Sequence, residues 1–193
     1  MHWTYCDGDL VSAEALAQAY GALTPSRKVH IDRFRRREDQ VRSLVAGILV
    51  EKLLKEHWGM ERISLCRDDS GRPYLSDCDL SVSISHSGNR VACAVSQKPV
   101  GIDLEQLRPV DLNLCRHICV EEERKYVFGP IPEWEGGLCH DREVLSRFFE
   151  IWTAKEAYFK RAGTGITDLK SVNVLPLPRQ IHWLEDHILQ IME

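Results

Sequence analysis

The chain has 193 residues, a formal net charge of −4 and ordinary hydrophobic (44%) and charged (28%) fractions, which allow one domain or two small ones with a proper core. The acidic balance argues against general nucleic-acid binding, and no apolar run is long enough to cross a bilayer. Seven cysteines, an odd number without CxxC pairs, indicate a reducing compartment. Because residues 1–7 do not resemble a signal peptide, we expect a cytoplasmic protein that binds neither nucleic acid nor membrane.

The first third of the chain predicts two helices separated by a basic run. Residues 12–22 predict a short helix capped by Ser12, which Thr24-Pro25-Ser26 ends. The basic residues of 27–37 lead into a predicted long helix over 38–57, where apolar residues recur at helical spacing. Cations are disfavoured at a helix N-terminus, and a bound anion such as a phosphate removes that cost. The basic run is therefore either a solvated face or an anion site, and the sequence leaves both open.

The middle of the chain predicts strands joined by tight turns. Residues 69–75 predict a turn from which Arg72 projects. Strands over 81–85, 90–96 and 100–105 predict a three-stranded antiparallel meander with Ser85 and His86 at one tip. A Ser-His pair in a turn is commonly a local hydrogen bond, and neither a third triad member nor a G-x-S-x-G elbow is present. Serine hydrolase chemistry is therefore disfavoured.

Two carboxylates stand two residues apart in the last of these strands, at Asp103 and Glu105. Because the side-chain period of a strand is two, both must leave by one face, while Ile102 and Leu104 leave by the other. Two like charges side by side repel unless a cation lies between them, and a hard divalent metal ion is one candidate. The alternative is the solvated face of an edge strand.

Cysteines and histidines between residues 115 and 140 do not have the spacing of a zinc module. The residues concerned are Cys115, His117, Cys119, Cys139 and His140. Helical cysteines usually fill core space, so we do not expect a zinc site.

A second predicted helix, over 146–160, carries a carboxylate inside its apolar stripe. Glu156 falls angularly between Phe149 and Trp152, with Lys160 one turn further on. A carboxylate among aromatic side chains is costly unless it is paired or binds a metal ion. A surface ion pair between Glu156 and Lys160 explains the pair but not its apolar neighbours. Gly163 and Gly165 are expected to end the helix, and residues 172–175 predict another strand.

These stretches, in this order, resemble the Sfp-type 4′-phosphopantetheinyl transferase family. The family's two motifs are G-[IV]-D-x-E and W-[ST]-x-K-E-[AS]-x-x-K, found here at residues 101–105 and 152–160. The basic helix entry, the Gly71-Arg72-Pro73 turn and residues 83–87 extend the likeness over roughly 25–175. The resemblance implies an α/β (α+β) fold, a pseudo-dimer of two subdomains that each pack a small antiparallel sheet with a long helix. We expect the subdomains to span 1–99 and 100–193.

The implied activity is transfer of the 4′-phosphopantetheine arm of coenzyme A to a serine of an apo acyl or peptidyl carrier protein. The reaction requires Mg²⁺ and releases 3′,5′-ADP, and we expect a monomeric enzyme. The alternative is a non-catalytic module of the same fold, with an incomplete second half, that binds coenzyme A or a carrier protein. A metal-dependent nuclease built on D-x-E is disfavoured by the acidic charge and by the second motif.

The resemblance also implies roles for individual residues. Asp103, Glu105 and Glu156 would hold Mg²⁺, and Glu156 would act as the general base. Lys160, and also Lys155, would stabilise charge on the diphosphate. The 3′-phosphate, ribose and adenine would be surrounded by residues of the first half, namely Arg27, His30, Arg42, Ser43, Arg72, Ser85 and His86. Relatives often carry Lys at the positions of Arg27 and His30, and His30 lends a full charge only when protonated.

The C-terminal region departs most from the family pattern. Relatives have a strand hairpin after the strand predicted at 172–175, whereas here Pro176-Leu177-Pro178-Arg179 follows and residues 181–192 show no clear strand alternation. We therefore expect the second half to lack this hairpin. Residues 181–192 would then cover the exposed sheet edge as a short helix or irregular segment.

Overall fold

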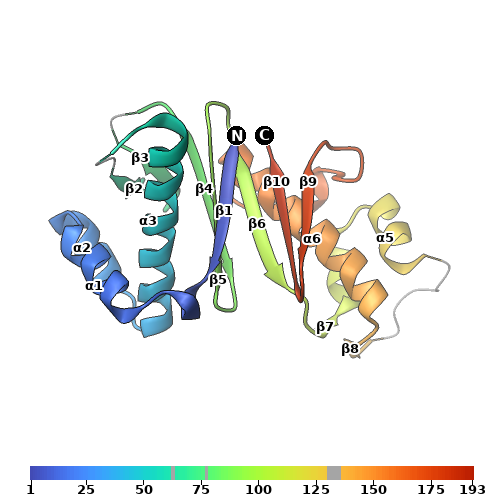
Figure 1. Ribbon diagram of the computed structural model, residues 1–193. Helices are drawn as coiled ribbons and strands as arrows, with labels where there is room; N and C mark the ends of the chain where they lie inside the picture. The colour runs from blue at the N-terminus through green and yellow to red at the C-terminus, as the bar shows by residue number, and fades with distance from the viewer. Residues whose placement is uncertain (62–63, 77, 130–135) are drawn as a thin grey trace.

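The computed structural model describes residues 1–61, 64–76, 78–129 and 136–193. It has mixed α/β architecture with two halves side by side, the blue-to-green half and the yellow-to-red half of Figure 1. The first half contains β1 (His2–Asp7), η1 (Gly8–Leu10), α1 (Ala13–Ala22), α2 (Pro25–Asp32), α3 (Arg37–Trp58), β2 (Leu65–Arg67), β3 (Pro73–Leu75), β4 (Ser81–Ser87) and β5 (Arg90–Ser96). The second contains β6 (Gly101–Gln106), β7 (Val110–Asp111), η2 (Leu112–Leu114), α4 (Cys115–Ile118), α5 (Glu121–Phe128), β8 (Leu138–Cys139), α6 (Arg142–Ala162), η3 (Leu169–Ser171), β9 (Gln180–Leu184) and β10 (His187–Met192).

The two halves repeat one arrangement. Each has a three-stranded antiparallel sheet, with strand order β1-β5-β4 in the first half and β6-β10-β9 in the second. In each, an opening strand is followed by a long helix, α3 or α6, and then by a hairpin whose second strand takes the centre of the sheet. The pseudo-dimer expected from the family resemblance is confirmed.

The predicted three-stranded meander is wrong in its third strand. The β4–β5 hairpin forms as expected, but the free edge of β5 is occupied by β1 from the start of the chain, so β6 belongs to the other sheet. β6 instead runs parallel to β4 in a different sheet. The two strands are joined by hydrogen bonds to serine side chains of β4, and they do not pair through their backbones. Three serine Oγ atoms of β4 accept a backbone N–H of β6 or of the residue before it: Ser81 from Val100 (3.2 Å), Ser83 from Ile102 (3.0 Å) and Ser87 from Gln106 (3.0 Å).

The predicted helices are confirmed with small changes of extent. Ser12 caps α1 by accepting the backbone N–H of Ala15, and the two long helices span 37–58 and 142–162. The basic run differs from expectation because its first part forms a separate short helix, α2, in which Pro25 occupies the first turn and Thr24 is the N-cap. No helix in the described ranges is both long enough and apolar enough to span a membrane.

The C-terminal region also differs from the sequence-based expectation. Residues 172–175 are irregular, and residues 180–184 and 187–192 form the hairpin that we expected to be missing. Every residue of β10 is buried, because β6 and β9 flank the strand and other elements cover both faces. A strand buried on both faces has no polar alternation, which is why the sequence pattern hid it.

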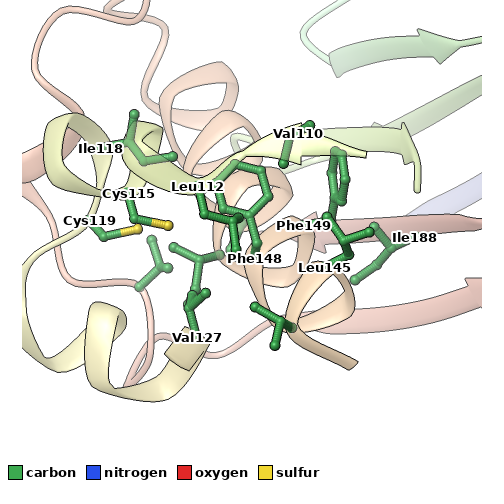
Figure 2. Close-up of a cluster of buried hydrophobic side chains, with 14 of the residues drawn as sticks. Val110, Leu112, Cys115, Ile118, Cys119, Val127, Leu145, Phe148, Phe149 and Ile188 are labelled. Carbon is green, nitrogen blue, oxygen red and sulfur yellow. The ribbon is translucent and has the colours of Figure 1, made fainter. Parts of the chain in front are cut away.

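Three hydrophobic clusters form the core. One lies in the first half around α3 and β5, and another lies between the two sheets around Ile102 and Leu104. The third packs α6 against residues 110–128 and Cys139, as the side chains of Phe148 and Phe149 in Figure 2 show. Cys115, Cys119 and Cys139 are buried within it and fill core space, as expected.

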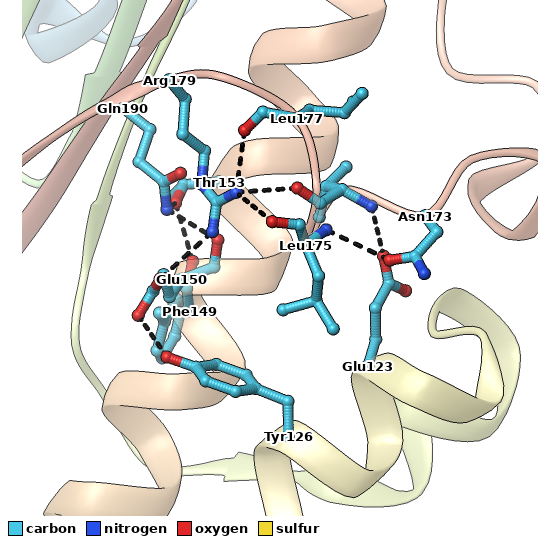
Figure 3. Close-up of polar contacts among 11 residues, drawn as sticks. Glu123, Tyr126, Phe149, Glu150, Thr153, Asn173, Leu175, Leu177, Arg179 and Gln190 are labelled. Carbon is cyan, nitrogen blue, oxygen red and sulfur yellow. Dashed lines mark hydrogen bonds and ion pairs between the residues drawn. The ribbon is translucent and has the colours of Figure 1, made fainter.

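Polar contacts fasten the segment after α6 to the side of that helix on which Glu150 lies (Figure 3). Glu150 accepts hydrogen bonds from the Tyr126 hydroxyl (2.7 Å) and from Arg179 (3.2 Å), and Arg179 also donates to the Val174 carbonyl (2.7 Å). The Gln190 amide of β10 donates to the Glu150 carbonyl (2.6 Å). These contacts fix how α6 lies across the second sheet.

Gly101 allows the closest approach between β6 and α6. A Cβ at this position would lie 1.9 Å from the Ala157 carbonyl oxygen and 2.6 Å from the Arg161 nitrogen. Both are backbone atoms, so no side-chain rotation can make room. The glycine of the first motif is therefore required by packing, and it brings the carboxylates of β6 next to the helix.

We expect Gly101→Ala to lower the free energy of unfolding by about 3 kcal/mol, because the helix must move away from the strand. Gly47→Ala is the control, since nothing lies within 4 Å of a Cβ there, in the interior of α3. That change should stabilise the protein by about 0.5–1 kcal/mol. Urea unfolding measures both, and equal effects of the two substitutions would contradict the packing argument.

Candidate active site

The carboxylates of β6 face α6. Asp103 is 3% exposed, and its Oδ1 accepts hydrogen bonds from Ser85 Oγ (2.7 Å) and from Lys160 Nζ (2.6 Å). Its other oxygen, Oδ2, is buried and has no hydrogen-bond partner among the described residues. A buried carboxylate oxygen without a donor is costly, so this atom is available for a cation.

Glu105 leaves β6 by the same face, as the strand period predicted. Its Oε2 accepts from Ser87 Oγ (2.9 Å) and its Oε1 from Trp152 Nε1 (3.1 Å). The solvated edge strand considered for this motif is wrong, because β4 covers β6 and Asp103 is buried.

Glu156 lies one helical turn before Lys160 and is half-buried. Burial is the main factor that raises its pKa to about 7, and the charges of Asp103 and Glu105 raise it further against the opposing effect of Lys160. Lys160 pairs with Asp103 and also donates to Ser85 Oγ (2.9 Å). A carboxyl group with a pKa near 7 can exchange a proton near neutral pH.

Two of these residues, Glu156 and Lys160, line a cleft of about 410 Å³ between the two halves. The second half contributes Glu156, Phe159, Lys160 and residues 163–166, and the first half contributes residues 70–73 and 82–84 together with Arg67. Arg72 lies against Gly163, where a Cβ would be 1.7 Å from Nη1. A larger cavity of about 600 Å³ lies between α1–α2 and α3, but the cleft is the one that contains the carboxylate and lysine of the second motif.

A group of positive charges lies in the first half. Arg27 is buried and donates from Nη2 to the carbonyl (3.1 Å) and Oγ (2.9 Å) of Ser43. Burial lowers the pKa of His30, and the charges of Arg27, Arg67 and Arg33 lower it further. The structure thus brings Arg27, His30 and Ser43 together, and it adds Arg67, which the sequence analysis missed because a lone Arg in a three-residue strand carries no signal.

Arg42 of α3 and His86 of β4 belong to the first half as well. Arg42 donates to the Gly88 carbonyl (2.9 Å) and pairs with Asp39 (2.6 Å). His86 is exposed at the surface, but desolvation by its surroundings lowers its pKa, and the charges of Arg42 and Lys160 lower it further. The charges of these two cations therefore both act on His86.

Lys155 is not part of the cluster. It is fully buried on the other side of α6, where Nζ pairs with Glu123 (2.8 Å) and donates to the carbonyls of Leu169 (2.7 Å) and Val172 (2.6 Å). The lysine holds the segment after α6 in place, and this position gives no support to the expected contact with a diphosphate.

The comparisons with known proteins agree with the two motifs. A family model described as "4′-phosphopantetheinyl transferase superfamily" matches residues 99–191, and one described as "4′-phosphopantetheinyl transferase, N-terminal" matches residues 11–98. The 4′-phosphopantetheinyl transferase HetI of Nostoc sp. is 30% identical over 179 residues, which cover 88% of this chain and 67% of the relative. The chain belongs to the 4′-phosphopantetheinyl transferase superfamily.

Other members of the superfamily match at similar identity. A 4′-phosphopantetheinyl transferase of Bacillus subtilis is 26% identical over 170 residues, covering 86% of this chain and 71% of the relative. The enzyme gsp of Aneurinibacillus migulanus is 34% identical over 131 residues, covering 67% of this chain and 51% of the relative. The chain thus spans between about half and seven tenths of the length of these two relatives.

The carboxylates fit the Mg²⁺ that membership of this superfamily implies. Three oxygen-bearing side chains converge, Asp103 Oδ2 has no donor, and mutual repulsion contributes to the raised pKa of Glu156. In the described parts of the chain, no three His, Cys, Asp or Glu side chains already enclose a metal position. That is compatible with Mg²⁺, which keeps several waters and takes substrate phosphate oxygens in addition to its carboxylate ligands.

The raised pKa of Glu156 predicts a pH-dependent stability in the absence of metal. The folded protein holds the proton more tightly than the unfolded chain, so stability falls as the pH rises from about 4.5 to 7 and stays lower above that range. The Glu156→Gln variant has no ionisable group at this position, so it should not lose stability as the pH rises through this range. Allowing for partial exposure, we expect the variant to be more stable than the wild type by about 1–2 kcal/mol at pH 8 and equally stable at pH 4.

Urea unfolding in chelator at the two pH values tests this expectation. Glu143→Gln is the control, because Glu143 is exposed near the start of the same helix and forms a surface pair with Arg147. A gain for Glu156→Gln that is the same at pH 4 and pH 8 would show that the Glu156 carboxylate does not cause it.

Proposed function

We propose that the chain transfers the 4′-phosphopantetheine arm of coenzyme A to a serine of an apo acyl or peptidyl carrier protein, with Mg²⁺, and releases 3′,5′-ADP. The observation that carries the proposal is the cluster of Asp103, Glu105, Glu156 and Lys160, of which Glu156 and Lys160 line the cleft between the halves. Its members are the chemical residues of both family motifs, brought together from β6 and α6. We further propose that one chain suffices, since each half supplies one wall of the cleft.

The proposed reaction needs three things from the protein. The serine Oγ of the carrier attacks the phosphorus next to pantetheine, and the bond from that phosphorus to the oxygen shared with the neighbouring phosphate breaks. Glu156 takes the hydroxyl proton, and burial together with the neighbouring carboxylates raises its pKa to about 7 in the metal-free protein. Lys160 places its charge beside the diphosphate, and Mg²⁺ held by Asp103, Glu105 and Glu156 would neutralise charge on the phosphate oxygens.

The basic group of the first half is proposed to bind the 3′-phosphate. Arg27 is held by Ser43, and Arg27 and Arg67 both lower the pKa of His30. Cations that mutually repel in the free protein are relieved when an anion binds between them. Arg72, at the cleft beside Gly163, is proposed to lie next to the adenine.

The alternative of a non-catalytic binding module loses its main support. That reading rested on a missing hairpin in the second half, and the hairpin is present as β9 and β10. β10 pairs with the whole length of β6 and so supports the strand that carries Asp103 and Glu105.

The transfer is tested by incubating the protein with coenzyme A and a panel of apo carrier proteins, with intact mass as the readout. A carrier should gain the phosphopantetheine mass only when coenzyme A and Mg²⁺ are both present. Asp103→Ala should abolish the gain, because it removes a metal ligand and the partner of Lys160. Normal transfer in excess chelator would contradict the metal assignment, and no transfer to any carrier would contradict the activity.

The phosphate site is tested by comparing coenzyme A with dephospho-coenzyme A in a calorimetric binding experiment. The wild type should bind coenzyme A more tightly, and Arg67→Ala should shrink the difference about tenfold, since a charge-assisted hydrogen bond contributes roughly 1.5–3 kcal/mol. Arg35→Ala is the control, because Arg35 is an exposed residue of the same basic run. Equal affinities of the wild type for the two ligands would exclude this site.

A further inference from the structure

Ser87 lies at the end of β4, and its hydrogen-bond partners show to which group its hydroxyl donates. Its Oγ accepts the backbone N–H of Gln106 (3.0 Å) and lies 2.9 Å from Glu105 Oε2. A hydroxyl has one proton to donate, and a carboxylate oxygen can only accept. With the amide donating to Oγ, the proton of Ser87 points at Glu105.

The backbone around Ser87 is anchored from three other elements. His187 of β10 contacts the Ser87 carbonyl through Nε2 (3.2 Å), and Arg42 of α3 donates to the Gly88 carbonyl (2.9 Å). The Asn89 carbonyl accepts the N–H of Gly8 (2.7 Å). The turn that follows Ser87 therefore has little freedom, and the serine is a fixed donor.

Glu105 is held by one donor from each half of the chain. Ser87 binds Oε2 from β4, and Trp152 binds Oε1 from α6. Two donors on different oxygens fix the plane of the carboxylate, and each oxygen keeps a lone pair for a further contact. The other serines of β4 differ: Ser81 and Ser83 accept backbone N–H groups of the β6 segment, and Ser85 shares Asp103 with Lys160.

We propose that Ser87 is a positioning residue that holds Glu105 in the orientation in which it binds the divalent cation. The inference rests on the proposed function and adds to it a residue outside the expected ligand set. Hydrogen bonds to ligating carboxylates fix their geometry before the metal arrives, and loss of such a partner typically costs about 10–100-fold in metal affinity. Ser87 supplies that bond from the half of the molecule that carries no carboxylate of the cluster.

The experiment measures Mn²⁺ binding by the electron paramagnetic resonance signal of the free ion, with and without coenzyme A. Ser87→Ala should raise the Kd about tenfold. Ser81→Ala is the matched control, because it removes an equivalent acceptor from the same strand but faces no carboxylate, and its Kd should stay within twofold of the wild type. In a Glu105→Gln background, Ser87→Ala should have no further effect, since Ser87 acts through Glu105.

Several results would overturn the proposal: an unchanged Kd for Ser87→Ala, an equal rise for Ser81→Ala, a full additional loss in the Glu105→Gln background, or no Mn²⁺ binding by the wild type. If Ser87→Ala does not fold, Ser87→Cys carries the same test, because a thiol keeps the volume but is a weak donor. The proposed function is judged separately by carrier mass. Wild-type protein that binds Mn²⁺ with the expected Ser87 dependence but modifies no carrier would refute the transfer and leave the positioning role standing.

Discussion

A buried carboxylate needs hydrogen-bond donors within the protein, and Asp103 accepts hydrogen bonds from both halves of the chain. Ser85 donates from the first half and Lys160 from the second, while Asp103 itself stands on β6. Breaking such a buried pair leaves an uncompensated charge, which is among the most costly changes a protein can undergo. The separation of β4 from α6, and with it the width of the cleft, is therefore tied to this one carboxylate.

Local periodicity predicted the chemical residues well. The period of two in a strand placed Asp103 and Glu105 on one face, and the helical period placed Glu156 in an apolar stripe, where burial raises its pKa. Both deductions depend only on neighbours in sequence. The motif glycine was different, because the need for Gly101 becomes evident only when the backbone of α6 is seen against β6.

Pairings between distant segments were the part that sequence reasoning could not supply. Nothing near β5 indicates that β1 takes its free edge, and β10 is buried so completely that its pattern resembles no half-exposed strand. Within a motif, too, sequence reasoning did not predict where every side chain lies, as Lys155 shows. It is adjacent in sequence to Glu156 but points away from the cleft, because a step of about 100° per residue turns it toward Glu123. Arg67 enters the site only through tertiary packing.

Both sheets place the last strand of their half at the centre. β5 pairs with β1, and β10 with β6, across sequence separations of about ninety residues. Contacts this distant in sequence form slowly, because the chain entropy of closing the loop is lost before the contact stabilises anything. The serine contacts between β4 and β6 depend on both sheets being in place. A chain that has formed its helices but not closed these two loops lacks these serine contacts, so we expect the alignment of β4 with the carboxylates of β6 to come late in folding.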